Sequence, residues 1–205
     1  MAKGLEYLHN LDIPHGDVKG VGFLPDPALI ITVSFSLLLS CIAMLILSRQ
    51  ANVIIDGTGH ARLTEYGLAP IYSDPSFAVA AAPGSVGTSR WLAPEIITPA
   101  RKRGTTPVIE SKAADVFAFG MLAVEVFTGK IPFEGQGNEA AVLRILKGGR
   151  PEIPGYAEDI GLTVEMRNLI ESCWRQNPKK RPTMEQVVRK WQKCVEGDGF
   201  LTAFP

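Results

Sequence analysis

Side chains that could support acid–base and metal chemistry lie on either side of an interruption in this sequence. His15-Gly16-Asp17-Val18-Lys19-Gly20 stops where Ala51-Asn52-Val53-Ile54-Ile55-Asp56 would continue it, and thirty residues of different composition lie between them. A carboxylate such as that of Asp17 can accept a proton from a hydroxyl group, and an amide oxygen such as that of Asn52 can bind Mg²⁺. Joined directly, the two pieces read H-G-D-V-K-G-A-N and bring these groups into one short loop.

The joined loop resembles the catalytic loop of protein kinases, in which H-x-D is followed by Asn five positions after the Asp. The resemblance implies that Asp17 is the catalytic base, that Lys19 lies near the transferred phosphoryl group, and that Asn52 holds Mg²⁺ on the phosphates of ATP. In the family, a Lys at this position indicates Ser/Thr specificity. Taken alone, His15-Gly16-Asp17 is more readily a turn after an N-terminal helix, so the assignment depends on the rest of the chain.

Three further motifs follow in the order in which kinases have them. Glu65, in T-E-Y-G-L-A, stands where the family has the Mg²⁺-binding Asp of D-F-G-L-A. The stretch G-T-S-R-W-L-A-P-E resembles the substrate-docking loop, which implies a hydrogen bond from its Thr88 toward Asp17 and Lys19. Glu95, at its end, is then expected to pair with a buried Arg181 in the C-W-x-x-x-P-x-x-R-P motif.

The substitution at position 65 bears on metal binding. Glu is one methylene longer than Asp, which adds about 1.5 Å of reach. Mg²⁺ requires near-octahedral geometry, and a misplacement of about 1 Å can lower a rate on the order of a hundredfold. We therefore expect Glu65 to remain a carboxylate ligand but a poorer one.

The elements that must position these side chains are mostly helices. Apolar spacing predicts helices over 1–10, 112–130, 139–147, 164–174 and 184–195, and two short strands, Val53–Ile55 and Ala61–Leu63. Asp115 is the one early acid of the buried second helix. It reads as a helix cap, and the resemblance adds that it accepts hydrogen bonds from the backbone near His15 and Gly16. The expected fold is mainly α, similar to the large C-terminal lobe of a kinase with a short β-hairpin near the catalytic loop, plus a hydrophobic helical insertion.

Residues 21–50 interrupt this pattern. Ala28 to Leu47 is an uncharged run of twenty residues, long enough as a helix to cross a hydrocarbon core of about 30 Å. A single crossing would place Asp17 and Asn52 on opposite sides of a bilayer. The segment starts with Val and ends with Gln, whose codons can begin GT and read CAG, so an intron translated in frame is the favoured interpretation. A membrane or hairpin helix and a soluble insertion are the alternatives, and sequencing the transcript across the codons for Gly20 and Ala51 distinguishes them.

Composition argues against several classes of function. The 205 residues hold 21 Lys and Arg against 21 Asp and Glu, so no net charge attracts nucleic acid or anionic lipid. Cys41, Cys173 and Cys194 are far apart, which argues against a disulfide framework and a zinc site. Residues 1–10 are charged and lack the apolar core of a signal peptide. We expect a cytoplasmic protein, with a membrane location as the alternative if 28–47 is a real span.

The domain organisation follows from these segments. We expect residues 1–20 and 51–196 to form the kinase C-lobe, 21–50 the insertion and 197–205 a tail. The sequence contains no G-x-G-x-x-G loop and no V-A-I-K lysine, so we expect the nucleotide-binding N-lobe to be absent.

By lineage, the chain would transfer the γ-phosphate of ATP, with Mg²⁺, to Ser or Thr hydroxyls of a protein substrate. As written, we expect it to be inactive. The alternatives are a catalytically dead lobe that docks other proteins and a membrane-anchored fragment.

Overall fold

A computed structural model of the chain describes residues 1–23, 52–55, 61–64, 88–97, 108–159 and 161–197. The hydrophobic helix expected at 28–47 and nearly all of the expected tail lie outside these described residues. Among the helices of the described ranges, none is both long enough and apolar enough to cross a membrane.

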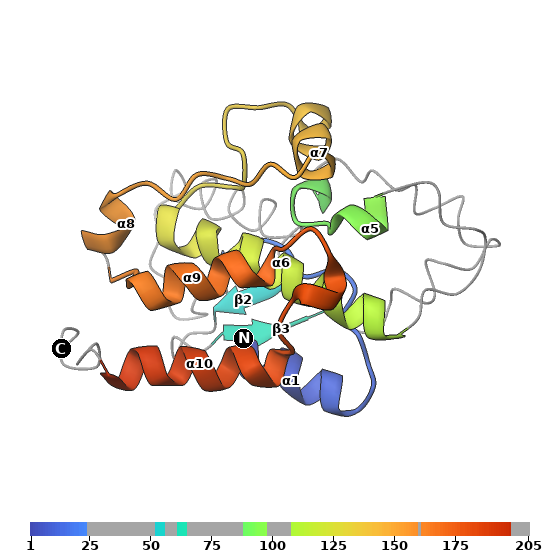
Figure 1. The fold of residues 1–205 in the computed structure, drawn as a ribbon, viewed down its shortest axis with the longest axis vertical. Helices are drawn as coiled ribbons and strands as arrows, with labels where there is room; N and C mark the ends of the chain where they lie inside the picture. The colour runs from blue at the N-terminus through green and yellow to red at the C-terminus, as the bar shows by residue number, and fades with distance from the viewer. Residues whose placement is uncertain (24–51, 56–60, 65–87, 98–107, 160, 198–205) are drawn as a thin grey trace, which may run out of the picture.

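Helices make up most of the described chain, as the sequence predicts (Figure 1). In chain order they are α1 (Ala2–Asn10), α5 (Pro94–Ile97), α6 (Val108–Thr128), α7 (Asn138–Leu146), α8 (Tyr156–Asp159), α9 (Val164–Cys173) and α10 (Met184–Gly197). Two 3₁₀ turns, η1 (Thr88–Arg90) and η2 (Pro178–Lys180), connect them. The mainly α fold class is confirmed, and four of the five predicted helices agree with the observed bounds to within about two residues.

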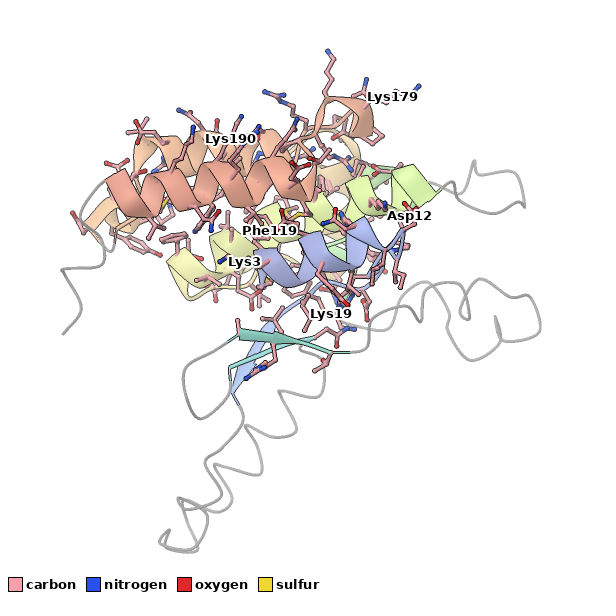
Figure 2. All side chains as sticks on the ribbon, turned by 90° about the horizontal axis from the view of Figure 1, so that it is seen from below. Lys3, Asp12, Lys19, Phe119, Lys179 and Lys190 are labelled. Atoms are coloured by element: carbon pink, nitrogen blue, oxygen red, sulfur yellow. The ribbon has the colours of Figure 1, made fainter. Side chains whose placement is uncertain are left out.

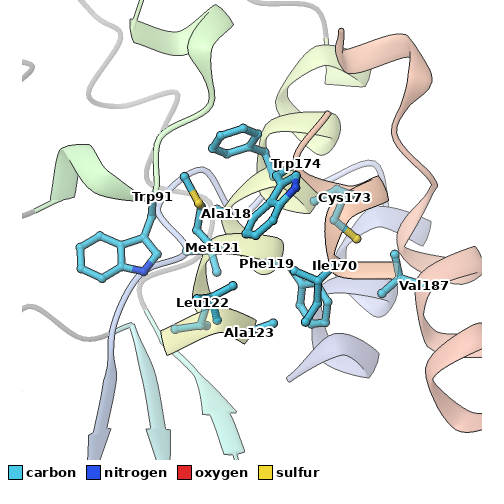
Figure 3. Close-up of a cluster of buried hydrophobic side chains, with 14 of the residues drawn as sticks. Trp91, Ala118, Phe119, Met121, Leu122, Ala123, Ile170, Cys173, Trp174 and Val187 are labelled. Carbon is cyan, nitrogen blue, oxygen red and sulfur yellow. The ribbon is translucent and has the colours of Figure 1, made fainter. Parts of the chain in front are cut away.

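Helix α6 forms the centre of the core (Figure 3). Phe117 and Met121 on this helix are completely buried, and α9 packs against it. A Cβ atom on Gly120 would lie 3.1 Å from the Cβ of Cys173 and 3.3 Å from the carbonyl oxygen of Ile170. The missing side chain at Gly120 thus allows α6 and α9 to approach closely, and burial of each large apolar side chain between them contributes about 1.5–3 kcal/mol.

The bounds of α6 differ from those expected, and the difference changes the interpretation of Asp115. The helix begins at Val108, four residues before Lys112, and ends at Thr128. Its end has a physical cause, since the Thr128 hydroxyl donates to the carbonyl of Val124 at 2.7 Å and Gly129 follows with φ of 66°. Because of the earlier start, Asp115 lies inside the helix, and its interpretation as an N-terminal cap is wrong.

Helix α10 closes the molecule on one side and carries the apolar face that its spacing predicts. Val187 and Val188 are buried, and Trp191 and Val195 are partly buried. The Trp191 ring meets the ring of Phe119 on α6 edge-on, with centroids 5.8 Å apart. Helix α1 also packs against α10, so the start of the described chain is attached to its end.

A three-stranded sheet lies on the other side of α1 and α6 from α10 (Figure 2). Strands β2 (Val53–Ile55) and β3 (Ala61–Leu63) pair antiparallel, which confirms the predicted hairpin. Strand β1 (Val21–Phe23) pairs with β2 in parallel, a strand that the sequence analysis did not anticipate. Parallel pairs require a long crossover connection rather than a local turn, so no turn motif in the sequence predicts them. Phe23 and Asn52, the described residues on either side of 24–51, therefore lie at the same small sheet.

Candidate active site

The structure brings together Asp17, Lys19 and Asn52 across the insertion. The Asn52 side-chain amide donates to Asp17 twice, to the carboxylate Oδ2 and to the backbone carbonyl, both at 2.8 Å. The backbone N–H of Asn52 donates to the Lys19 carbonyl at 3.0 Å. The Lys19 Nζ lies 2.7 Å from the same Oδ2 of Asp17, beside the sheet (Figure 2). The contacts between the two halves that the joined sequence implies are therefore present, although the halves are not adjacent in the chain.

Burial separates the roles that these side chains can take. Asn52 is 1% exposed, whereas the Asp17 side chain is 28% exposed and within reach of solvent. Both donors contact Oδ2, and among the described residues Oδ1 of Asp17 receives no hydrogen bond. The Asn52 side-chain nitrogen donates to Asp17. The Asn52 side-chain oxygen is therefore the acceptor that could hold a cation. Asp17 thus has one oxygen anchored and one available.

Hydrogen bonds to the Asp115 side chain hold the backbone before Asp17 in place. This carboxylate is buried and accepts hydrogen bonds from the amides of His15 at 2.7 Å and Gly16 at 2.8 Å. It also lies 2.9 Å from Nε2 of His9. The two backbone hydrogen bonds are those that the kinase resemblance implies. His9 was not identified from the sequence, because nothing in its spacing indicates a partner on a helix a hundred residues away.

His15 supports the loop as a neutral side chain. The ring is buried, and its Nδ1 accepts a hydrogen bond from the Asp17 amide at 3.3 Å. Within the described part of the chain, its Nε2 has no hydrogen-bond partner. Burial lowers the pKa of His15 below its usual value of 6.5 and outweighs the opposing charges of Asp115 and Asp17. The imidazole is therefore uncharged at neutral pH, and protonating it would place a cation in the core.

This environment predicts a pH dependence of stability. Because the folded pKa of His15 lies below the unfolded value, the unfolded chain takes up the proton first as pH falls. The contribution is complete above pH 6.5 and is lost as pH decreases from 6.5 through the lower folded pKa, with a slope of at most about 1.4 kcal/mol per pH unit. Urea unfolding at pH 7.5, 6.5 and 5.5 gives the free energy of unfolding at each pH. Its slope against pH should be smaller in His15→Asn than in the parent chain. Equal slopes in both proteins would contradict the assignment.

The pair predicted between Glu95 and Arg181 is present and bidentate. Arg181 Nη1 lies 2.6 Å from Oε1 of Glu95, and Nη2 lies 2.9 Å from Oε2. The Arg181 side chain has 0% exposure and that of Glu95 has 15%. Arg181 also donates to the carbonyls of Ala113 and Arg175, each at 2.8 Å. The pair fastens α5 to α6 and to the chain before η2, which agrees with the structural role expected of it.

Arg90 is a buried residue for which the sequence analysis found no role. Its guanidinium donates to the carbonyls of Pro132 at 2.8 Å and Phe133 at 2.9 Å, and to the carbonyl of Gln136. Its Nε donates to the side chain of Asn138 at 2.8 Å. The only sequence signal was its position in the G-T-S-R-W motif. Arg90 attaches the expected substrate-docking loop to the connection between α6 and α7.

Two predicted site residues are not placed by the structure. Glu65 lies outside the described residues, and Thr88 begins η1 with a side chain that is not described. In the described ranges, no cluster of three or more His, Cys, Asp or Glu residues could hold a metal ion. The donor chemistry nevertheless fits Mg²⁺, because Asn52 offers an amide oxygen and Glu65 a carboxylate, both hard oxygen ligands.

The known proteins to which this chain is similar are protein kinases. The protein kinase domain family matches residues 49–191. A light-sensor protein kinase of Ceratodon purpureus is 30% identical over an alignment of 198 positions that covers 92% of this chain and 13% of the relative. A dual specificity protein kinase of Dictyostelium discoideum is 29% identical over 189 residues, 92% of this chain and 10% of the relative. A serine/threonine/tyrosine-protein kinase of Arabidopsis thaliana is 24% identical over an alignment of 207 positions that covers 99% of this chain and 41% of the relative.

The chain therefore spans much less than two thirds of the length of these relatives. In general, members of the matched family use ATP with Mg²⁺ and act on protein substrates. The match begins at residue 49 and so excludes His15 to Gly20, but the hydrogen bonds from Asn52 attach that segment to the matched region. Since the matched region is more than half of the sequence, the chain belongs to the protein kinase domain family.

Proposed function

We propose that His15 to Gly20 and Asn52 form the catalytic loop of a Ser/Thr protein kinase. The observation that carries this proposal is the contact of 2.8 Å between Asn52 Nδ2 and Asp17 Oδ2 across the insertion. Phosphoryl transfer depends on positioning and electrostatic stabilisation rather than on covalent chemistry by the protein, and these residues supply the positioning. Bound ATP would supply the phosphoryl group, and bound Mg²⁺ would supply positive charge at its oxygens.

Each residue then has a role derived from its contacts. Lys19 and Asn52 hold Oδ2 of Asp17, so Oδ1 is free to orient the substrate hydroxyl and accept its proton. The Asn52 oxygen, and Glu65 by resemblance, would hold Mg²⁺. The ammonium of Lys19 stands beside the site of transfer, where it favours negative charge on the moving group. Asp115 prevents the loop backbone from shifting.

The assignment of Ser and Thr as the acceptors rests on Lys19. Lys19 stands two residues after Asp17, the family pattern for Ser/Thr kinases. Two of the relatives are named as dual specificity and as serine/threonine/tyrosine kinases. We assign Ser and Thr hydroxyls as the acceptors on the basis of Lys19. Phosphotyrosine in a phosphoamino-acid analysis of the product would contradict this assignment.

We also propose that residues 1–20 and 51–196 form one lobe, with 21–50 as an insertion. Support comes from the hydrogen bonds of Asn52 to Lys19 and Asp17 and from the packing of α1 on α10. The first residues of the insertion, β1, pair with β2, the strand that follows the insertion. The chain therefore enters and leaves the insertion at the same sheet. A path that leaves and returns at one sheet keeps both halves of the catalytic loop together.

We propose further that residues 1–205 alone do not transfer phosphate. The sequence holds neither a glycine-rich loop nor a strand lysine to clamp the phosphates, and Glu65 replaces an Asp ligand. We expect the melting temperature of the chain to be the same with and without 5 mM (about physiological) MgATP, because a ligand far below its Kd stabilises little. Differential scanning fluorimetry measures this directly. A clear rise in melting temperature that is lost in Asn52→Ala would show that the chain binds MgATP at this site and would remove the missing nucleotide site as the reason for inactivity.

A second candidate function, a catalytically dead lobe that docks other proteins, is favoured by Glu65. The extra methylene weakens the metal site without affecting the helical surface. Phosphoryl transfer and docking differ in one readout, since only transfer requires the Asp17 carboxylate. That difference is the basis of the first experiment in the Discussion.

A further inference from the structure

We propose that a cavity between the α6–α7 connection and α8 is a docking site for an acidic peptide segment of a partner protein. The cavity has a volume of about 340 Å³ and lies among the C-terminal end of α6, the loop that follows it, α7 and residues 150–156. None of the catalytic-loop residues lines it. Binding there requires neither ATP nor phosphoryl transfer, so it is separable from the proposed function.

The cavity has an excess of positive charge. Lys130, Arg144 and Arg150 line it together with two acids, Glu134 and Glu152. Lys130 lies 3.4 Å from Glu134 in an exposed pair, so these two charges largely offset each other. The exposed Glu152 is then the one lining acid against two cations, Arg144 and Arg150. The guanidinium of Arg150 donates to Trp174, Gly149 and Gln176, which holds it in place in the cavity wall.

Arg144 is the cation that remains available. It lies in the last turn of α7, is exposed, and stands over the ring of Phe133 at 5.5 Å from the centroid. Among the described residues, its guanidinium N–H groups have no hydrogen-bond acceptor. A guanidinium fork pairs with a carboxylate in a bidentate manner, and the ring beneath it limits its motion. An acidic side chain therefore complements this position best.

The rest of the cavity is suited to apolar neighbours of such an acid. Ile131 and Tyr156 line it and remain 43% and 45% exposed. Pro132, Pro151 and Pro154 complete the wall. Large apolar side chains that stay exposed around a hollow are typical of protein interaction sites, and a peptide that places an acid between apolar side chains would cover both features.

The floor of the cavity is held in an unfavourable backbone conformation. Phe133 has φ of 57°, a value that a bulky non-glycine residue rarely adopts. The Arg90 guanidinium donates to its carbonyl at 2.9 Å, which helps to hold this conformation. Because Arg90 belongs to η1, the floor of the cavity and the expected substrate-docking loop are fastened to each other. A peptide bound here would lie on the same rigid unit that receives the substrate hydroxyl.

Fluorescence anisotropy with the full 205-residue chain tests the proposal. The probe is a labelled pool of seven-residue peptides with a central Glu flanked by Ala, Leu, Ile, Phe and Tyr, compared with the same pool carrying a central Gln. We expect saturable binding of the Glu pool that is about tenfold tighter than that of the Gln pool. Arg144→Gln should remove this preference.

Lys147→Gln is the matched control, because Lys147 directly follows α7, is exposed, and does not line the cavity. It should keep the preference for the Glu pool, and both variants should melt at the parent temperature. The proposal is overturned by equal binding of the two pools, by equal losses in Arg144→Gln and Lys147→Gln, or by no saturable binding up to about 1 mM, the weak limit of specific recognition. These outcomes do not depend on phosphoryl transfer, so the binding assay tests this proposal even if the chain is catalytically inactive.

Discussion

Replacing Asp17 with Asn should lower phosphoryl transfer at least about a hundredfold in a chain that has a complete nucleotide site. A suitable chain is a chimera that joins the small lobe of a relative, such as the Ceratodon purpureus kinase, to residues 1–205. Asn has the same shape and can still accept the hydrogen bond from Asn52, but it cannot accept a proton from the substrate hydroxyl. Transfer of radiolabelled phosphate to a general protein acceptor measures the rate.

Two controls separate catalysis from folding in that experiment. Asp159→Asn makes the same change on the exposed surface of α8 and should leave the rate unchanged. The Asp17→Asn chimera should bind ATP as the parent chimera does, because Asp17 is not among the expected metal ligands. A chimera that binds MgATP but transfers no phosphate even with Asp17 intact would favour the dead docking lobe, and transfer that survives Asp17→Asn would refute the proposed base.

Removal of the Glu95 carboxylate should destabilise the lobe more than any surface substitution. Glu95→Ala leaves the buried guanidinium of Arg181 facing only backbone carbonyls and the ring of Phe117, 5.0 Å from its centroid. Breaking one side of such a buried pair costs about 3–5 kcal/mol. Urea unfolding at pH 7.5 should show this loss in the free energy of unfolding.

The matched control is Glu158→Ala, which removes an exposed partner 3.1 Å from Arg167. Exposed ion pairs contribute at most about 1 kcal/mol, so this variant should unfold close to the parent. The double variant Glu95→Ala with Arg181→Met should recover part of the loss, because the uncompensated charge is gone. If Glu95→Ala and Glu158→Ala were equally stable, the buried pair would not have the structural importance assigned to it.

Some features of this lobe are readable from short stretches of sequence. The apolar face of α10 and the hairpin of β2 and β3 follow from local spacing, because side-chain periods of 3.6 and 2 reveal which face each element buries. The end of α6 depended on Thr128 and Gly129. Its start was missed although Thr106 and Pro107, directly before Val108, are residue types typical of a helix start. The pairing of Glu95 with Arg181 came from motif order in the family rather than from periodicity.

Other features were decided only by the tertiary structure. The parallel pairing of β1 with β2 and the hydrogen bond of His9 to Asp115 join residues that are far apart in the chain and that no motif connects. The contact of Asp17 with Asn52 was expected from the joined motif, and only its atoms and distances come from the fold. The strained Phe133 and its support by Arg90 are equally invisible to spacing. Residue types along the chain determined the helices, the hairpin and the family. Where no family motif linked distant residues, packing decided which of them meet, because contacts across long loops depend on the whole core and leave no periodic mark in the sequence.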